Sequence, residues 1–180
     1  MRTLIVRSIV SALVGSATAL PAAAQDAGFI TLEAQAGYAG FVDDATIDHG
    51  YLGGAFKARL TPRLSIGPEI VWMRGPQHDR DLFLTGTLTW DLVSARQTGG
   101  GEPGRQATTR VVPFLMAGGG AMRHEDRFGV ETFASWEGAV TGGGGVRIHV
   151  GRRWYIAPEF RIGWEPHYRV GVAVGVDLED

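Results

Sequence analysis

Histidines and carboxylates gather in segments that look like connections between regular elements. Four of the five histidines lie there, with six acidic residues nearby: His49, His78, His124 and His167, and Asp43, Asp44, Asp48, Asp79, Glu125 and Asp126. If these groups met at one edge of the fold, they could hold a metal ion or transfer protons. Their spacing matches no H-E-x-x-H or related ligand motif, however, and histidines are common in polar loops. We therefore expect solvated loop residues, with no metal, no cofactor and no catalytic residue.

A nucleophilic site would need a serine beside a histidine. Ser135 and His124, eleven residues apart across one connection, are the pair that the sequence offers. The glycine runs A-G-G-G-A and T-G-G-G-G-V lack the lysine and the following helix of a phosphate-binding loop. We expect a protein that is not an enzyme, and a lipid-modifying enzyme that uses Ser135 and His124 is the rival hypothesis.

Composition limits the class of protein. The chain has 180 residues, with 17 basic and 19 acidic side chains, 44% hydrophobic residues and no cysteine. This length suits one domain, and the lack of cysteine excludes disulfides and thiol chemistry. The mild acidity argues against a nucleic-acid partner.

The first 24 residues have the order of a secretory signal. Arg2 and Arg7 come first, a mainly apolar stretch follows from Ser8 to Leu20, and P-A-A-A precedes Gln25. The apolar stretch is shorter than the roughly 20 residues that a spanning helix needs. We expect a signal peptide over residues 1–24 and one mature domain over residues 25–180.

Alternation of apolar and polar residues indicates strands along the mature chain. Between residues 82 and 92 the even positions are Leu or Trp apart from one glycine, and threonine dominates the odd positions. This period of two is that of a strand. We expect no helix and eight strands, at approximately 28–38, 50–60, 64–74, 81–92, 110–123, 135–150, 153–164 and 167–178.

An internal repeat supports two halves of four strands each. Residues 53–69 align with residues 143–159 at a shift of 90, and the matches include Arg63 with Arg153, Pro68 with Pro158 and Glu69 with Glu159. The second and third strands thus correspond to the sixth and seventh. We predict an all-β fold, an eight-stranded antiparallel up-and-down barrel.

The tryptophans indicate which face of the sheet is outside. All five share the even parity of the aliphatic residues and lie near strand ends, as an aromatic girdle at two membrane interfaces requires: Trp72, Trp90, Trp136, Trp154 and Trp164. We therefore expect a transmembrane barrel whose even-numbered apolar residues face lipid. A secreted soluble barrel that binds a small apolar ligand, with the even residues inside, is the alternative.

The opposite face is charged and would line the lumen. It carries Glu33, Gln35, Lys57, Arg59, Glu69, Arg123, Glu137, Arg147, His149, Glu159, Arg161, Arg169 and Asp177. Side chains fill the interior of an eight-stranded barrel, so buried charges there must pair. We predict a lumen plugged by Lys57, Glu69, Arg147, Glu159 and Arg161, with Lys57 paired to Glu69 and Arg147 to Glu159.

The chain contains the strands V-V-P-F-L-M-A-G-G-G-A-M (111–122) and W-Y-I-A-P-E-F-R-I-G (154–163), together with the signal and the eight-strand pattern. These features resemble the small outer-membrane β-barrels of the OmpA/OmpX type. The resemblance covers the mature chain. It implies an outer-membrane location, periplasmic termini and a structural or surface-interaction role. The implied partners are outer-membrane lipid, lipopolysaccharide and the barrel-assembly machinery, for a chain that is a monomer.

Three features depart from this family. The chain ends Leu178-Glu179-Asp180 rather than in an aromatic residue. Strand prolines occur at positions 68, 113 and 158, where each removes a hydrogen-bond donor from the ladder. Residues 93–109 form a long connection on the side expected to carry short turns, and we expect it to be disordered.

Overall fold

The computed structural model describes residues 30–42, 46–76, 79–93, 110–128, 131–150, 153–164 and 167–178. The predicted signal peptide, and all but the first residue of the 93–109 connection, lie outside these ranges. In the described part, no helix is long and apolar enough to cross a membrane.

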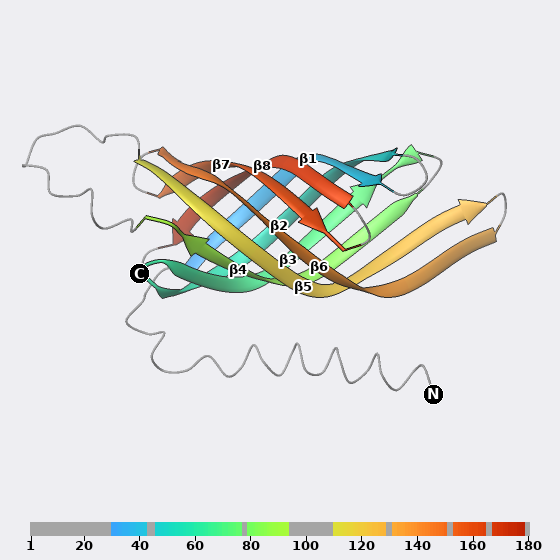
Figure 1. Ribbon diagram of the computed structural model, residues 1–180, viewed down its shortest axis with the longest axis horizontal. Coiled ribbons are helices and arrows are strands. Elements are labelled where there is room, and N and C mark those ends of the chain that lie inside the picture. The colour runs from blue at the N-terminus through green and yellow to red at the C-terminus, as the bar shows by residue number, and fades with distance from the viewer. Residues whose placement is uncertain are drawn as a thin grey trace, which may run out of the picture.

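Eight antiparallel strands close into a barrel (Figure 1), which confirms the predicted fold. They are β1 (Ile30–Val42), β2 (Thr46–Thr61), β3 (Leu64–Arg74), β4 (Arg80–Asp91), β5 (Arg110–Phe128), β6 (Glu131–Val150), β7 (Trp154–Gly163) and β8 (His167–Leu178). We call the end with the β1–β2, β3–β4, β5–β6 and β7–β8 connections the outer end. The inner end is where β1 begins and β8 finishes.

The strand register fixes the width of the barrel. A circuit from Ile30 of β1, followed from partner to partner, returns to β1 at Gly40, ten residues farther along. For eight strands this stagger corresponds to a strand tilt of about 40° and to an interior just wide enough for side chains.

The internal repeat is present in the strand pairing. A shift of 90 residues carries the partners Ala58 and Ile66 onto the partners Ile148 and Ile156. Both hairpins also lack paired residues at the same place, opposite Pro68 in one and opposite Pro158 in the other. A proline has no N–H to donate, so the ladder opens on one side of each proline strand while the other side stays paired.

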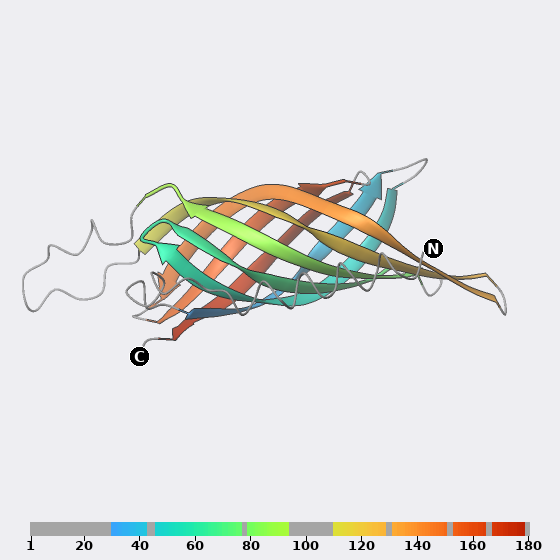
Figure 2. The same cartoon turned by 90° about the horizontal axis from the view of Figure 1, so that it is seen from below.

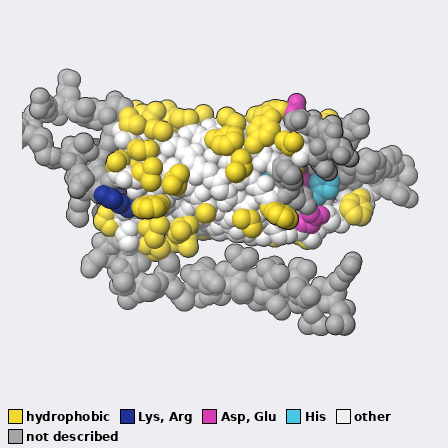
Figure 3. Space-filling model, viewed as in Figure 1, with side chains coloured by type: hydrophobic (Ala, Val, Ile, Leu, Met, Phe, Trp, Pro, Cys, Tyr) yellow, Lys and Arg dark blue, Asp and Glu magenta, His cyan; other side chains and the backbone are white. Residues whose placement is uncertain are grey.

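Even-numbered residues face outward on seven strands, but β5 has the opposite parity. Phe114 and Met116 are buried, whereas Val111 and Leu115 are exposed. The prediction that even residues face lipid is therefore wrong for β5. Both faces of this strand are apolar or small, so its sequence does not distinguish inside from outside. Large hydrophobic side chains are exposed on the strands, and Figure 3 shows groups of them on one face of the barrel.

The β5–β6 hairpin is longer than expected. We predicted a connection over residues 124–134, but β5 continues to Phe128 and β6 begins at Glu131. Figures 1 and 2 show this hairpin projecting past the other strands at the outer end. The barrel therefore carries a β-ribbon that extends beyond its rim.

Candidate functional site

Ion pairs connect opposite walls of the lumen. Arg161 of β7 contacts both carboxylate oxygens of Glu69 on β3 at 2.8 and 2.7 Å, and its Nη2 lies 3.0 Å from Glu159 Oε1. Arg169 Nη1 of β8 lies 3.6 Å from Glu69 Oε1. Side chains from three strands thus meet in the middle of the barrel.

A second group of pairs lies closer to the inner end. Lys57 Nζ is 2.6 Å from Glu33 Oε2, and Arg147 Nη1 donates to Asp91 Oδ1 at 2.8 Å. The Tyr155 hydroxyl also donates to Glu33. The Arg147 guanidinium carbon lies 4.9 Å from the Tyr155 ring centroid, within the range of a cation–π contact.

The five predicted lumen residues are all buried, but two predicted pairs are wrong. Lys57 pairs with Glu33 rather than Glu69, and Arg147 pairs with Asp91 rather than Glu159. The hairpin ladders are interrupted beside Lys57 and Arg147, and the lumen is narrow enough for each long cation to reach another strand. Proximity within a hairpin therefore does not decide the partner.

An apolar layer separates this network from the outer mouth. It consists of Ala39, Tyr51, Val71, Met73, Phe83, Met122 and Ala139, and we call it the outer apolar cluster. On β4 the inward residues run in order from the outer end: Asp81, Phe83, Thr85, Thr87, Thr89 and Asp91. The lumen is thus divided into a polar mouth, an apolar layer and a charged interior.

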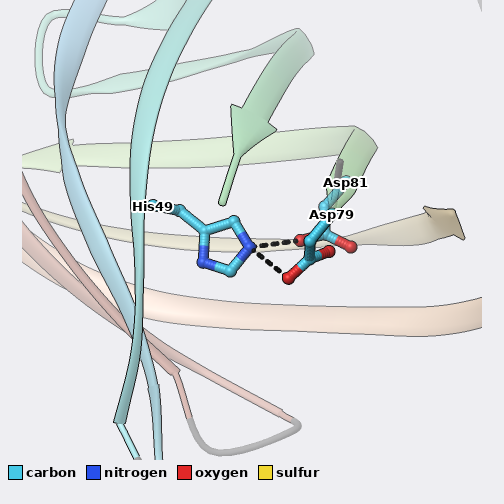
Figure 4. A group of neighbouring side chains, drawn as sticks. All are labelled: His49, Asp79 and Asp81. Atoms are coloured by element: carbon cyan, nitrogen blue, oxygen red, sulfur yellow. Dashed lines mark hydrogen bonds and ion pairs between the residues drawn. The ribbon is translucent and has the colours of Figure 1, made fainter. Parts of the chain in front are cut away.

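A histidine and two aspartates meet at the outer mouth. His49 of β2 points toward Asp79, just before β4, and toward Asp81 (Figure 4). His49 Nε2 lies 2.9 Å from Asp79 Oδ2 and 3.4 Å from Asp81 Oδ2. His124 Nδ1 of β5 lies 2.7 Å from Asp81 Oδ1 on the far side. These four residues are called the outer-mouth cluster.

Burial governs the electrostatics of this cluster. His49 and Asp81 are each only 2% exposed. Asp81 lies beyond the lipid-facing Leu82 and Trp72 pair, at the rim, and burial raises the pKa of its carboxyl while the His124 hydrogen bond opposes the rise. The expectation of solvated loop residues is therefore wrong for His49 and Asp81.

Ser135 and His124, the pair proposed from the sequence, are neighbours, but each side chain contacts another residue. Ser135 lies directly opposite His124 in the β5–β6 ladder. The Ser135 hydroxyl donates to Glu137 Oε1 at 3.0 Å, and His124 Nδ1 faces Asp81. The two residues are therefore neighbours, and the hydroxyl is bound to a carboxylate.

The other predicted rim residues are dispersed. Asp48 accepts a hydrogen bond from Tyr38, and His167 Nδ1 lies 3.1 Å from the Trp164 carbonyl oxygen. Arg123, expected in the lumen, lies on the outer face of β5 and pairs with Glu125 at 2.9 Å. His78, Asp43 and Asp44 lie outside the described residues, as does the side chain of Asp126.

All five tryptophans are exposed on the barrel wall. Trp72, Trp136 and Trp164 belong to the outer half of the molecule, and Trp90 and Trp154 to the inner end. The five side chains thus lie outside the lumen, and their role as an aromatic girdle stays a prediction.

Sequence reasoning missed part of the lumen network. Asp91 ends the alternating stretch of β4 on the inward parity, and Tyr155, Phe114 and Met116 contribute apolar atoms to the same region. Parity alone would have placed Asp91 and Tyr155 inside. For Phe114 and Met116 the sequence carries no such signal, because β5 is apolar on both faces.

No protein-family model matches the chain, and no curated protein matches its sequence. Solved structures do match its fold. The N-terminal β-barrel domain of Pseudomonas aeruginosa OprF is similar with a TM-score of 0.63 at 12% identity, over 84% of this chain and 98% of that one. Neisserial surface protein A (NspA) gives a TM-score of 0.66 at 11% identity, over 84% and 97%.

A de novo designed transmembrane β-barrel also matches, with a TM-score of 0.50 at 14% identity, over 84% of this chain and 96% of the design. Identities this low carry the fold and not the activity. The chain has the fold of the small eight-stranded outer-membrane β-barrels, the type that its sequence resembles.

Proposed function

We propose that this chain is a non-enzymatic outer-membrane protein with a closed lumen and a structural or surface-interaction role. The observation that carries the proposal is the combination of an apolar, tryptophan-bordered exterior with an interior filled by its own side chains. An apolar exterior with an ion-paired interior suits a barrel that lies in lipid, and it is unsuited to a soluble carrier of apolar ligands.

The interior supports a closed barrel rather than a channel. Arg161 and Glu69 span the lumen, and Met73 and Phe83 belong to the apolar layer above them. An eight-stranded barrel has little room beyond what these side chains occupy. The proposed role is therefore mechanical or interactive, without diffusion through the lumen.

The β5–β6 hairpin supports a role at the cell surface. Phe133 is 62% exposed on the part of β6 that projects beyond the rim. An exposed aromatic side chain outside the apolar band is a common contact for partners or lipid headgroups. In this proposal the contacts of the monomeric barrel are outer-membrane lipid and lipopolysaccharide, and the assembly machinery inserts it.

Surface display can be tested with single cysteines, because the natural chain contains none. Phe133→Cys should react with a membrane-impermeant maleimide on intact cells. The matched control is Arg63→Cys in the exposed β2–β3 turn at the inner end, which should react only after the cells are lysed. The reverse labelling pattern, or recovery of the chain in the soluble periplasm, would contradict the proposal.

A lipid-modifying enzyme is the second candidate, and one observation favours it. Ser135 lies opposite His124, and His124 in turn contacts Asp81, an order that resembles a nucleophile, a base and an orienting acid. Mass analysis of lipid A from cells with and without the chain decides between the two. Unchanged lipid A supports the non-enzymatic role. An acyl change that disappears in both Ser135→Ala and His124→Ala would establish the enzyme.

A further inference from the structure

The outer-mouth cluster has the composition and spacing of a metal site. We propose that His49, Asp79 and Asp81 bind one divalent transition-metal ion, with His124 as a positioning residue that holds the Asp81 carboxylate. This site would make the barrel a metal-binding protein of the cell surface, a property separate from its closed lumen.

The three ligand atoms already lie at the separations of a coordination sphere. One nitrogen of His49 and one oxygen from each aspartate lie within 4.8 Å of one another. A tetrahedral ion with bonds of about 2.0–2.1 Å holds its ligand atoms about 3.3 Å apart. The His49 to Asp79 and His49 to Asp81 distances of 2.9 and 3.4 Å are close to that value.

The sequence places these ligands at or next to strand ends. Asp81 is the second residue of β4 and Asp79 lies two residues before it, a spacing that sends both side chains to the same face of an extended chain. His49 comes from β2 and is buried against Phe41, with ring centroids 5.0 Å apart. Two strand ends therefore hold the ligands without a long loop.

Two further observations concern the ligand atoms. Asp79 Oδ1 is buried, and no described residue donates a hydrogen bond to it. His124 Nδ1 is 3.8 Å away, too far for such a bond. Gly75 faces the imidazole, and a Cβ there would lie 2.5 Å from His49 Nε2. The lack of a side chain at position 75 therefore makes room for the His49 imidazole beside the two aspartates.

The environment favours a cation. Two carboxylates meet beside the imidazoles of the outer-mouth cluster, and carboxylate oxygens attract cations. The outer apolar cluster separates it from the arginines of the lumen, while the side chain of His124 is 36% exposed at the mouth. The site is therefore open to ions from outside and closed toward the inside.

The donor set selects the class of ion. Imidazole with carboxylate oxygens suits Zn²⁺, Fe²⁺, Co²⁺ or Ni²⁺, whereas Mg²⁺ and Ca²⁺ prefer oxygen ligands alone. Three protein ligands leave further coordination positions toward the open mouth for water. Zn²⁺ and Co²⁺ are thus suitable probes, the second because its visible absorption reports the ligand geometry.

The test is titration of the purified chain, without a histidine tag and after chelator treatment, with Zn²⁺ by calorimetry and with Co²⁺ by absorption. We expect one ion per barrel. His49→Gln and Asp79→Asn should each weaken binding by at least about tenfold, since even ligand-supporting residues contribute that much. Glu125→Gln is the matched control, because it removes a carboxylate from the same rim outside the cluster, and its affinity should equal that of the natural chain.

His124 requires its own comparison. His124→Gln keeps a donor for Asp81 and should bind Zn²⁺ more tightly than His124→Ala, whose side chain makes no hydrogen bond. Heat-modifiable gel mobility verifies that each variant is folded. No Zn²⁺ binding by the natural chain, or equal affinity in the natural chain, His49→Gln and Asp79→Asn, would overturn the site. Equal affinity in His124→Ala and the natural chain would overturn the positioning role.

Discussion

Arg161 is the central residue of the lumen ion pairs, because it joins two buried carboxylates from different strands. Arg161→Met would leave Glu69 and Glu159 without this partner. We predict a loss of about 3–5 kcal/mol in the free energy of unfolding, the usual cost of removing one partner of a buried ion pair. Urea-dependent unfolding in detergent micelles measures it.

Two further variants make this measurement specific. Arg153→Met removes an exposed arginine at the inner end and should change stability little. Adding Glu159→Gln to Arg161→Met should recover part of the loss, because it removes the carboxylate whose ion pair was lost, while Glu69 still faces Arg169. Equal stability of Arg161→Met and Arg153→Met would show that the lumen network contributes nothing.

The metal site makes a prediction about pH. Zn²⁺ binds a neutral imidazole and a charged carboxylate, so protons compete with it. Burial raises the pKa of the Asp81 carboxyl, so this ligand binds a proton more readily as the pH falls. Between about pH 7.5 and about pH 5.5 we expect the Zn²⁺ affinity to fall by at least about tenfold. Calorimetry at both pH values checks this, and an affinity that rises on acidification would contradict it.

At the scale of the element, β5 is the strand for which the sequence pattern cannot tell which face points into the lumen. Leu115 is 49% exposed and Met116 is 7% exposed, which reverses the parity of the other strands. A polarity-sensitive fluorophore attached at Leu115→Cys should be quenched by brominated lipid, and one at Met116→Cys should not. Leu88→Cys and Thr87→Cys on β4 are controls, with quenching expected at the even position. Quenching at 116 rather than 115 would reject the β5 register.

The close approach of β2 and β3, where their hydrogen-bond ladder is interrupted, yields a second prediction at the scale of the element. A Cβ at Gly67 would lie within 1.7 Å of the Phe56 carbonyl oxygen, whereas at Gly119 the first contact is at 3.8 Å. Gly67→Ala should therefore destabilise the barrel by about 1–3 kcal/mol, the typical cost of overpacking. Gly119→Ala should be nearly neutral. Equal unfolding midpoints for the two variants would contradict this close approach of β2 and β3.

Most of the elements could be predicted from the sequence because alternation is a strong signal wherever one face is apolar and the other polar. On β4, Leu82 to Trp90 alternate with threonines, and the strand is found within one residue of its expected bounds. On β5 every position from Val111 to Met122 is apolar or small. Alternation therefore cannot show which face of this strand points into the barrel. The extended β5–β6 hairpin was missed for a related reason, since polar rim residues look like a loop.

The candidate site was only half predictable. The sequence placed the histidines near one rim, and the spacing of Asp79 and Asp81 could have indicated a shared face. It could not show that His49 lies against them, because strand tilt and register around the whole barrel bring β2 and β4 together there. The same holds for Lys57 and Arg147, whose partners depend on reach across the lumen.

At the scale of the whole molecule, three layers follow one another inside one apolar wall: the outer-mouth cluster, the outer apolar cluster and the charged interior. In the proposed closed barrel, the side chains of each layer fill the interior at their own level. A molecule built in this way would separate what it binds at its outer mouth from the interior of the barrel.

Conductance of the purified monomer in planar lipid bilayers tests this central claim most directly. Insertion is verified on the same protein by quenching of its exposed tryptophans with brominated lipid. We predict an inserted protein without stable single-channel steps, because side chains occupy the lumen from the mouth to the inner ion pairs. Stable, large conductance from the inserted monomer would contradict the closed barrel.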